Sequence, residues 1–105
     1  MTTLTTSEIS NAERHEIRLI VAHVCEATGV TVESMTGRSR KGRVAAARQL
    51  AMTLIREGTM LSLAEIGSLF ERDHGTVIHA IKATRKRNQT DPAAAAVYAG
   101  AQRNR

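Results

Sequence analysis

The residues whose types suit chemistry are one cysteine and four histidines. They are Cys25, His15, His23, His74 and His79. Their positions do not reproduce the paired spacing of a zinc site, and no nucleophile lies beside a base in a pattern typical of covalent catalysis. We therefore expect no metal site and no catalytic residue, so the chain is not predicted to be an enzyme. Cys25 is interpreted as a small apolar side chain on a helix.

A run of cations between two glycines, residues 37–44, superficially resembles a phosphate-binding loop. It lacks the lysine and the serine or threonine that should follow the second glycine, and no strand can be placed before it. We therefore exclude a nucleotide site and expect no cofactor. The segment is interpreted as a basic loop.

The charge is divided unevenly along the chain. Residues 1–36 hold two basic and five acidic residues, whereas residues 37–105 hold thirteen basic and five acidic residues, a net charge of +8. A basic block of this kind attracts polyanions, either nucleic acid or an acidic membrane surface. The alternative, a basic face that is simply solvated, stays open at this point.

The sequence gives no sign of a membrane segment. No apolar run approaches the ~20 residues that a membrane span needs, and the first ten residues lack the pattern of a signal peptide. The single cysteine rules out an intramolecular disulfide and fits a reducing compartment. We expect a cytoplasmic protein.

Apolar residues recur at helical spacing through most of the chain, which favours an all-α fold. The expected helices cover residues 11–28, 44–57, 62–70 and 73–87, with a short turn at 30–35 and a weak Ala-rich helix at 93–101. We expect a flexible N-terminus at 1–10, one domain at 11–87 and a C-terminal extension at 88–105.

Capping signals support these helices. Ser10 with Glu13 and Ser62 with Glu65 match the capping box. Asp73 is a good N-cap residue, and Gly29 suits the left-handed position that ends a helix.

The pair of helices at 62–70 and 73–87 has the form of a helix-turn-helix. A small residue, Gly67, allows the second helix to pack closely against the first. The second helix has an apolar inner face formed by Val77, Ala80, Ile81 and Thr84, and an outer face formed by Gly75, His79, Lys82 and Lys86. A purely structural helix pair remains an alternative.

The residues themselves resemble a known family. The stretch SLAEIGSLFERDHGTVIHA at 62–80 and the run RQLAM at 48–52 look like the C-terminal DNA-binding domain of the bacterial replication initiator DnaA. The resemblance covers about residues 11–87. It implies a small all-α domain with a helix-turn-helix of the Trp repressor and DnaA domain IV type, and double-stranded DNA as the partner.

The resemblance also implies roles for individual residues. Arg40 aligns with a loop arginine that enters the minor groove, where it can sense a narrow A·T-rich groove. Asp73, His74 and Thr76 fall where the family reads bases in the major groove. The full set of candidate DNA-binding residues is Arg38, Arg40, Lys41, Arg43, Arg48, Gln49, Arg56, Arg72, Asp73, His74, Gly75, Thr76, His79 and Lys82. Of these, Arg48, Gln49 and Arg56 are expected near the phosphate backbone.

Structural alternatives accompany these assignments. Asp73 can serve only as a helix cap, and His79 as a solvated surface residue. Arg72 can pair with Glu71 or Glu65, and the basic loop can be solvated.

Two features depart from the family pattern. Only one residue, Glu71, separates Phe70 from the Arg-Asp-His run, so the turn is one residue shorter than the family's usual form. Gly75 replaces the first threonine of the family's pair. Both changes fall at the end of the helix that determines specificity.

The leading hypothesis is a stand-alone, nucleoid-associated DNA-binding protein that regulates replication initiation or transcription at sites like the DnaA box. A phage, plasmid or other mobile element is one source that we consider. Other replication proteins are further partners to consider, and neither membrane nor nucleotide is expected. The alternative from another class is a protein-interaction module that binds the initiator or another replication partner, with the acidic N-terminal third in that role.

Overall fold

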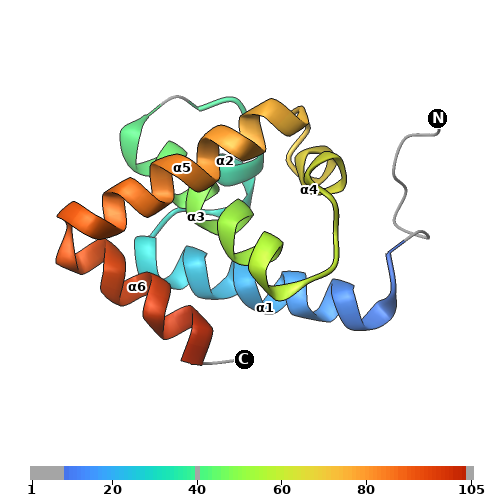
Figure 1. The fold of residues 1–105 in the computed structure, drawn as a ribbon, viewed down its shortest axis with the longest axis horizontal. Helices are drawn as coiled ribbons and strands as arrows, with labels where there is room; N and C mark the ends of the chain where they lie inside the picture. Colours follow the sequence, from blue (N-terminus) through green and yellow to red (C-terminus); the bar gives the residue numbers. More distant parts are fainter. Residues whose placement is uncertain (1–8, 40, 104–105) are drawn as a thin grey trace.

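A computed structural model of the chain describes residues 9–39 and 41–103, and these form helices without strands. The helices are α1 (Asn11–Thr28), α2 (Val32–Thr36), α3 (Gly42–Gly58), α4 (Leu63–Leu69), α5 (His74–Thr90) and α6 (Pro92–Arg103). In Figure 1, α1 runs along the lower side and α5 along the upper side, with α3 between them. The predicted all-α fold class is confirmed.

Helix α3 is the centre of the core, because it contacts every other helix. Ala47, Leu50, Ala51 and Leu54 share one apolar face of α3 and are buried, but every residue from Leu50 to Ile55 is buried too. A helix that is apolar on one face only would leave half of these positions in water. The surrounding helices therefore cover this segment of α3 on all sides.

The capping boxes predicted from the sequence are present. The hydroxyl oxygens of Ser10 and Ser62 accept the backbone N–H groups of Glu13 and Glu65, each at 3.1 Å. The two glutamate carboxylates accept the serine N–H groups in return. Gly29 ends α1 in the left-handed conformation with φ 75°, as predicted.

The turn between α4 and α5 depends on a close approach at Gly67. A Cβ atom added to Gly67 would lie 2.4 Å from the carbonyl oxygen of Arg72, so any side chain there would collide with backbone. The Arg72 N–H donates to the Gly67 carbonyl at 2.8 Å. The chain reverses through Glu71, which has φ 56°. The close packing predicted at Gly67 is confirmed.

The C-terminal third differs from the prediction. Helix α5 continues to Thr90 instead of ending at Arg87, and α6 follows after Asp91 alone. Pro92 takes the first position of α6, where its missing N–H costs no hydrogen bond. Helix α6 packs against α1, α3 and α5, and Ala101 is buried. The Ala-rich segment is therefore a packed helix, and Val97 and Tyr98 pack against the core together with Ala101.

The expected flexible N-terminus falls largely on residues 1–8, which lie outside the described residues. Ile9, the first described residue, is 6% exposed and belongs to the core. Within the described ranges, no helix is long and apolar enough to cross a membrane. The same part of the chain holds no group of three or more metal-binding side chains.

Candidate nucleic-acid interface

The N-terminal end of α5 presents four exposed residues in sequence, Asp73, His74, Gly75 and Thr76. The Asp73 carboxylate caps the helix by accepting the Thr76 backbone N–H at 2.9 Å and the Thr76 hydroxyl at 3.1 Å. Donation by the Thr76 N–H, and then by its hydroxyl, holds the pKa of Asp73 below its ordinary value. The carboxylate is therefore ionised at neutral pH and available as a hydrogen-bond acceptor.

The rest of α5 separates its faces as predicted. Val77, Ala80 and Thr84 are buried against the core. His79 and Lys82 are exposed, and helical geometry places them within about 60° of Gly75 around the helix axis. Helix α5 therefore carries a continuous exposed polar strip that starts at its N-terminal end.

The basic loop connects α2 to α3. Arg38, Lys41 and Arg43 are exposed, whereas the prediction for Arg40 lies outside the described residues. Lys41 occupies the N-cap position of α3 and forms no side-chain cap hydrogen bond. The first N–H groups of α3 therefore add their partial positive charge to the cations of the loop.

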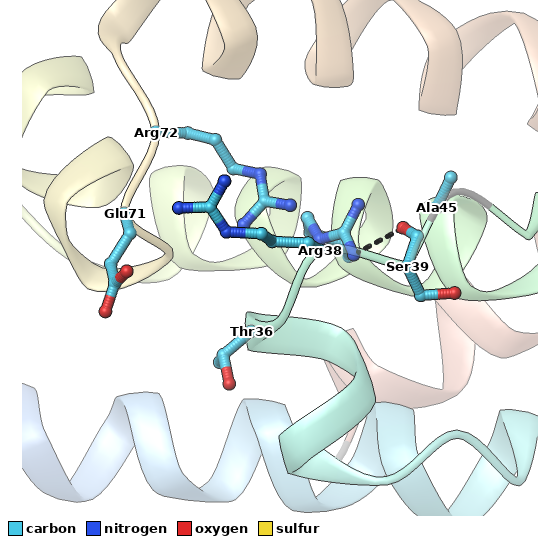
Figure 2. Close-up of a pocket in the computed structure, with 7 residues that line it drawn as sticks. Thr36, Arg38, Ser39, Ala45, Glu71 and Arg72 are labelled. Atoms are coloured by element: carbon cyan, nitrogen blue, oxygen red, sulfur yellow. Dashed lines mark hydrogen bonds between the residues drawn. The ribbon is translucent and has the colours of Figure 1, made fainter.

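An open cleft of about 470 Å³ lies where this loop meets the turn before α5. Figure 2 shows Arg38 and Arg72 reaching into it, with Thr36 and Ser39 along the loop side. Arg48 completes the lining from α3. Three guanidinium groups and one carboxylate, that of Glu71, give this cleft a net positive charge.

Arg48 is buried beneath the loop, with 8% of its surface exposed. Its Nε donates to the Met35 carbonyl at 2.6 Å and its Nη2 to the Ser39 carbonyl at 3.2 Å, the bond dashed in Figure 2. Burial, and then the charge of Arg72, lower the pKa of Arg48. Arg48 thus holds the loop from below, and its expected phosphate contact stays a prediction.

Arg72 donates to backbone carbonyls on both sides of the cleft. Its Nη1 reaches the Phe70 carbonyl at 2.6 Å, and its Nη2 reaches the Gly37 carbonyl at 2.7 Å. The Glu65 carboxylate is engaged in the α4 capping box, and the Glu71 carboxylate points away from Arg72 in Figure 2. The structure therefore gives Arg72 carbonyl partners in place of the acidic partners considered above.

The remaining two candidates lie farther along α3. The Gln49 side-chain oxygen accepts from Arg87 at 3.0 Å, which ties α3 to α5. Arg56 is exposed and donates to the Leu61 carbonyl at 3.1 Å. Fifteen residues separate it from Lys41, or about 22 Å of helix, so the structure does not bring Arg56 to the loop.

The structure thus gathers the loop cations, Arg48 and Arg72 next to the N-terminal end of α5. Sequence reasoning missed Thr36, Ser39 and the Gly37 carbonyl as parts of this site. The polar residue types beside the basic run were the only signal for the first two, and no sequence pattern marks a carbonyl as an acceptor.

The chain is similar to proteins of one family. The family model described as the bacterial DnaA protein helix-turn-helix matches residues 17–83. The chain is 42% identical over 76 residues to the chromosomal replication initiator protein DnaA of Thermodesulfovibrio yellowstonii. It is 47% identical over 75 residues to that of Desulfotalea psychrophila and 45% identical over 73 residues to that of Thermus thermophilus.

These matches cover most of the chain but a small part of each relative. They include 71%, 71% and 69% of the chain, and 17%, 15% and 17% of the respective relatives. The matched region contains the basic loop, α3, α4 and most of α5. The chain belongs to the bacterial DnaA helix-turn-helix family.

Proposed function

We propose that this chain binds double-stranded DNA, with the N-terminal end of α5 in the major groove and the basic loop in the adjacent minor groove. Membership in the DnaA helix-turn-helix family supports the proposal. The single observation that carries it is the packing of the cationic loop beside the exposed end of α5, joined by the bond from Arg72 to Gly37. Two elements that read DNA can then engage neighbouring grooves at once.

The exposed end of α5 has the chemistry to distinguish bases. The Asp73 carboxylate can accept from cytosine N4, and the Thr76 methyl group and the His74 ring can contact base edges. The apolar side of α5 is buried, so the polar strip is the face left for a ligand. We propose that this strip makes binding sequence-specific, at sites related to the DnaA box.

The basic loop suits the minor groove and the phosphates beside it. Arg38, Lys41 and Arg43 are exposed cations, and the expected minor-groove role of Arg40 remains part of this proposal. The open N-terminus of α3 adds N–H donors of the kind that bind phosphate oxygens. We propose that the loop supplies much of the affinity and some preference for A·T pairs.

The biological role proposed from the relatives is replication initiation or transcriptional regulation at the nucleoid. The groups at the interface are cations, donors and acceptors that suit recognition, so we propose binding without catalysis. We retain the residue range 11–87 as the proposed DNA-binding domain, and α6 as an extension that braces it.

The test is the salt dependence of binding to a duplex, measured by fluorescence anisotropy between low and moderate salt. Neutralising roughly five phosphates predicts a log–log slope of about −4 to −5. A flat response, or no binding to duplex DNA at low salt, would contradict the proposal and favour a protein-interaction module. Selection from random duplexes then identifies the preferred site.

A further inference from the structure

We propose that Arg72 is a positioning residue that fixes the basic loop relative to the N-terminal end of α5. The proposal deepens the DNA-binding function above and rests on it. It assigns Arg72 a role within the protein, whereas the sequence suggested a direct contact with DNA. The consequence is that Arg72 sets how the two reading elements are spaced before DNA arrives.

The geometry of Arg72 is that of a bridge. One nitrogen of its guanidinium donates to the Phe70 carbonyl, within the turn that precedes α5. The other donates to the Gly37 carbonyl, 35 residues away in the sequence. Both distances are short, and donors that carry charge form the stronger class of hydrogen bond. The rigid fork of arginine fixes the two carbonyls relative to each other.

The Gly37 carbonyl is shared by two arginines, because Arg48 also donates to it. Arg48 Nη2 lies 3.5 Å from the Gly37 oxygen and 3.4 Å from the Ser34 oxygen, besides its bonds to Met35 and Ser39. Arg48 therefore attaches the loop to α3, and Arg72 attaches it to the turn before α5. The two arginines meet at one acceptor.

Gly37 itself is attached to the end of α2, because its N–H donates to the Ser34 carbonyl at 3.3 Å. A Cβ atom added to Gly37 would lie 2.9 Å from the Glu33 carbonyl oxygen. The backbone on the α2 side of the loop is therefore in close contact with α2. The link from Gly37 through Arg72 to α5 is short and is anchored at both ends.

A fixed loop matters for binding to two grooves. A loop that samples many conformations in the free protein must be ordered when DNA binds, and the loss of conformational entropy weakens binding. A loop already held beside α5 avoids most of that cost. Removing the hydrogen bonds of Arg72 should therefore reduce the contribution of the loop to DNA affinity and leave the contribution of α5 unchanged.

The first test needs no DNA. Limited trypsin digestion of the folded protein reports opening of the loop through cleavage after Arg38 and Lys41. We expect Arg72→Gln to speed this cleavage about tenfold, with a melting temperature close to that of the wild type. Arg72→Lys, which can satisfy one of the two carbonyls, should fall between them. Arg18→Gln removes the same charge from an exposed site on α1 and should change nothing.

Unchanged cleavage in Arg72→Gln would overturn the proposal, as would faster cleavage throughout the chain. If Arg72→Gln fails to fold, the comparison of Arg72→Lys with the wild type decides the same question. This result does not depend on DNA binding, so it separates a failure of the bridge from a failure of the proposed function.

The second test is a double-mutant cycle on duplex DNA. Lys41→Ala should lower the DNA affinity of the wild type several-fold. It should change the DNA affinity of Arg72→Gln little, because the loop of that variant already contributes less to binding. His74→Ala should cost the same factor in both backgrounds. If Arg72 instead contacts a phosphate, both pairs will be additive and the salt slope of Arg72→Gln will fall by about one. That outcome would overturn the proposal while upholding DNA binding.

Discussion

The two helices of the helix-turn-helix begin in different ways. Helix α4 begins with a closed capping box, in which Ser62 and Glu65 satisfy each other's backbone N–H groups. Helix α5 begins with Asp73, which accepts the Thr76 N–H, and no acidic residue follows in its first turn. Its first residues are exposed. The first end is closed by a reciprocal capping box, whereas the second is capped from one side only and keeps an exposed first turn; we call an N-terminus without a capping box an open end.

The same contrast separates α1 from α3. Helix α1 has a capping box made by Ser10 and Glu13, whereas α3 starts at Lys41 without any side-chain cap. Of these four N-termini, the two without a capping box are the ones beside the basic loop. The uncapped N-terminus of α3 exposes N–H donors and the positive end of the helix dipole, which favour anions, whereas α5 presents the Asp73 carboxylate and an exposed first turn. The closed ends thus contribute to the stability of the fold, and the open ends are the ones that we propose as the DNA interface.

The largest expected effect comes from a charge in the buried side of α4. Ile66 is fully buried, so Ile66→Asp should unfold the domain, since an unpaired buried charge costs several kcal/mol against a total stability of about 5–15 kcal/mol. Thermal melting followed by circular dichroism checks this. Ala64→Asp, on the exposed side of the first turn, is the control and should fold. A normal melt for Ile66→Asp would show that α4 does not hold the fold.

A side chain added at position 75, near the N-terminal end of α5, should increase the discrimination between bases. A Cβ atom added to Gly75 would meet only the Asp73 Oδ1 atom, at an ordinary 3.5 Å, so Gly75→Thr should fold normally. A threonine offers a methyl group and a hydroxyl to the bases, worth about tenfold in discrimination at one base pair. Binding to every single-base variant of the preferred site measures it. No change at any position would mean that position 75 does not face a base.

The backbone of the turn between α4 and α5 is slightly strained at Glu71. Glu71 has a left-handed φ of 56°, which costs a non-glycine residue about 1–2 kcal/mol. Glycine relieves it at an entropic cost of about 0.5–1 kcal/mol. Glu71→Gly should therefore raise the free energy of unfolding by about 0.5 kcal/mol, measured by urea denaturation. A clear loss of stability would contradict the account of this turn.

The smallest effect is expected in α6, away from the open ends. Burial, and then the hydrogen bond to Glu57, raise the pKa of Tyr98 to about 12. Because the pKa of Tyr98 is higher in the folded state, protonated Tyr98 adds to the free energy of unfolding below the ordinary tyrosine pKa of 10. This contribution is lost as the pH rises from 10 towards 12. Since Tyr98 is the only tyrosine, the absorbance of tyrosinate follows it directly. A midpoint near 10 would contradict the contact, and Tyr98→Phe should leave DNA affinity unchanged.

Local features of the fold could be predicted from the sequence. The capping boxes at Ser10 and Ser62, the left-handed Gly29 and the close approach at Gly67 depend on residues within a few positions of each other. The inner and outer faces of α5 follow from helical periodicity. The local chemistry of these residues leaves few alternatives, so the pattern is sufficient.

Contacts between distant segments could not be predicted. The burial of Arg48 and the bond from Arg72 to Gly37 arise only when α2, α3 and the turn before α5 come together. An arginine near a basic loop suggests a phosphate contact, and nothing in its neighbours indicates a backbone carbonyl instead. The packing of α6 was missed for a similar reason, because alanine carries a weak apolar signal and its burial depends on the helices around it.

The most direct test of the central claim is a matched pair of cap substitutions, Asp73→Asn on α5 and Ser62→Asn on α4. Asparagine is a good N-cap, so both variants should fold, as melting curves will check. The selected DNA sites should change for Asp73→Asn, because an amide prefers adenine where a carboxylate accepts from cytosine, and should stay the same for Ser62→Asn. If Asp73→Asn selects the same sites as the wild type, Asp73 is only a cap and the open end of α5 does not read bases through it.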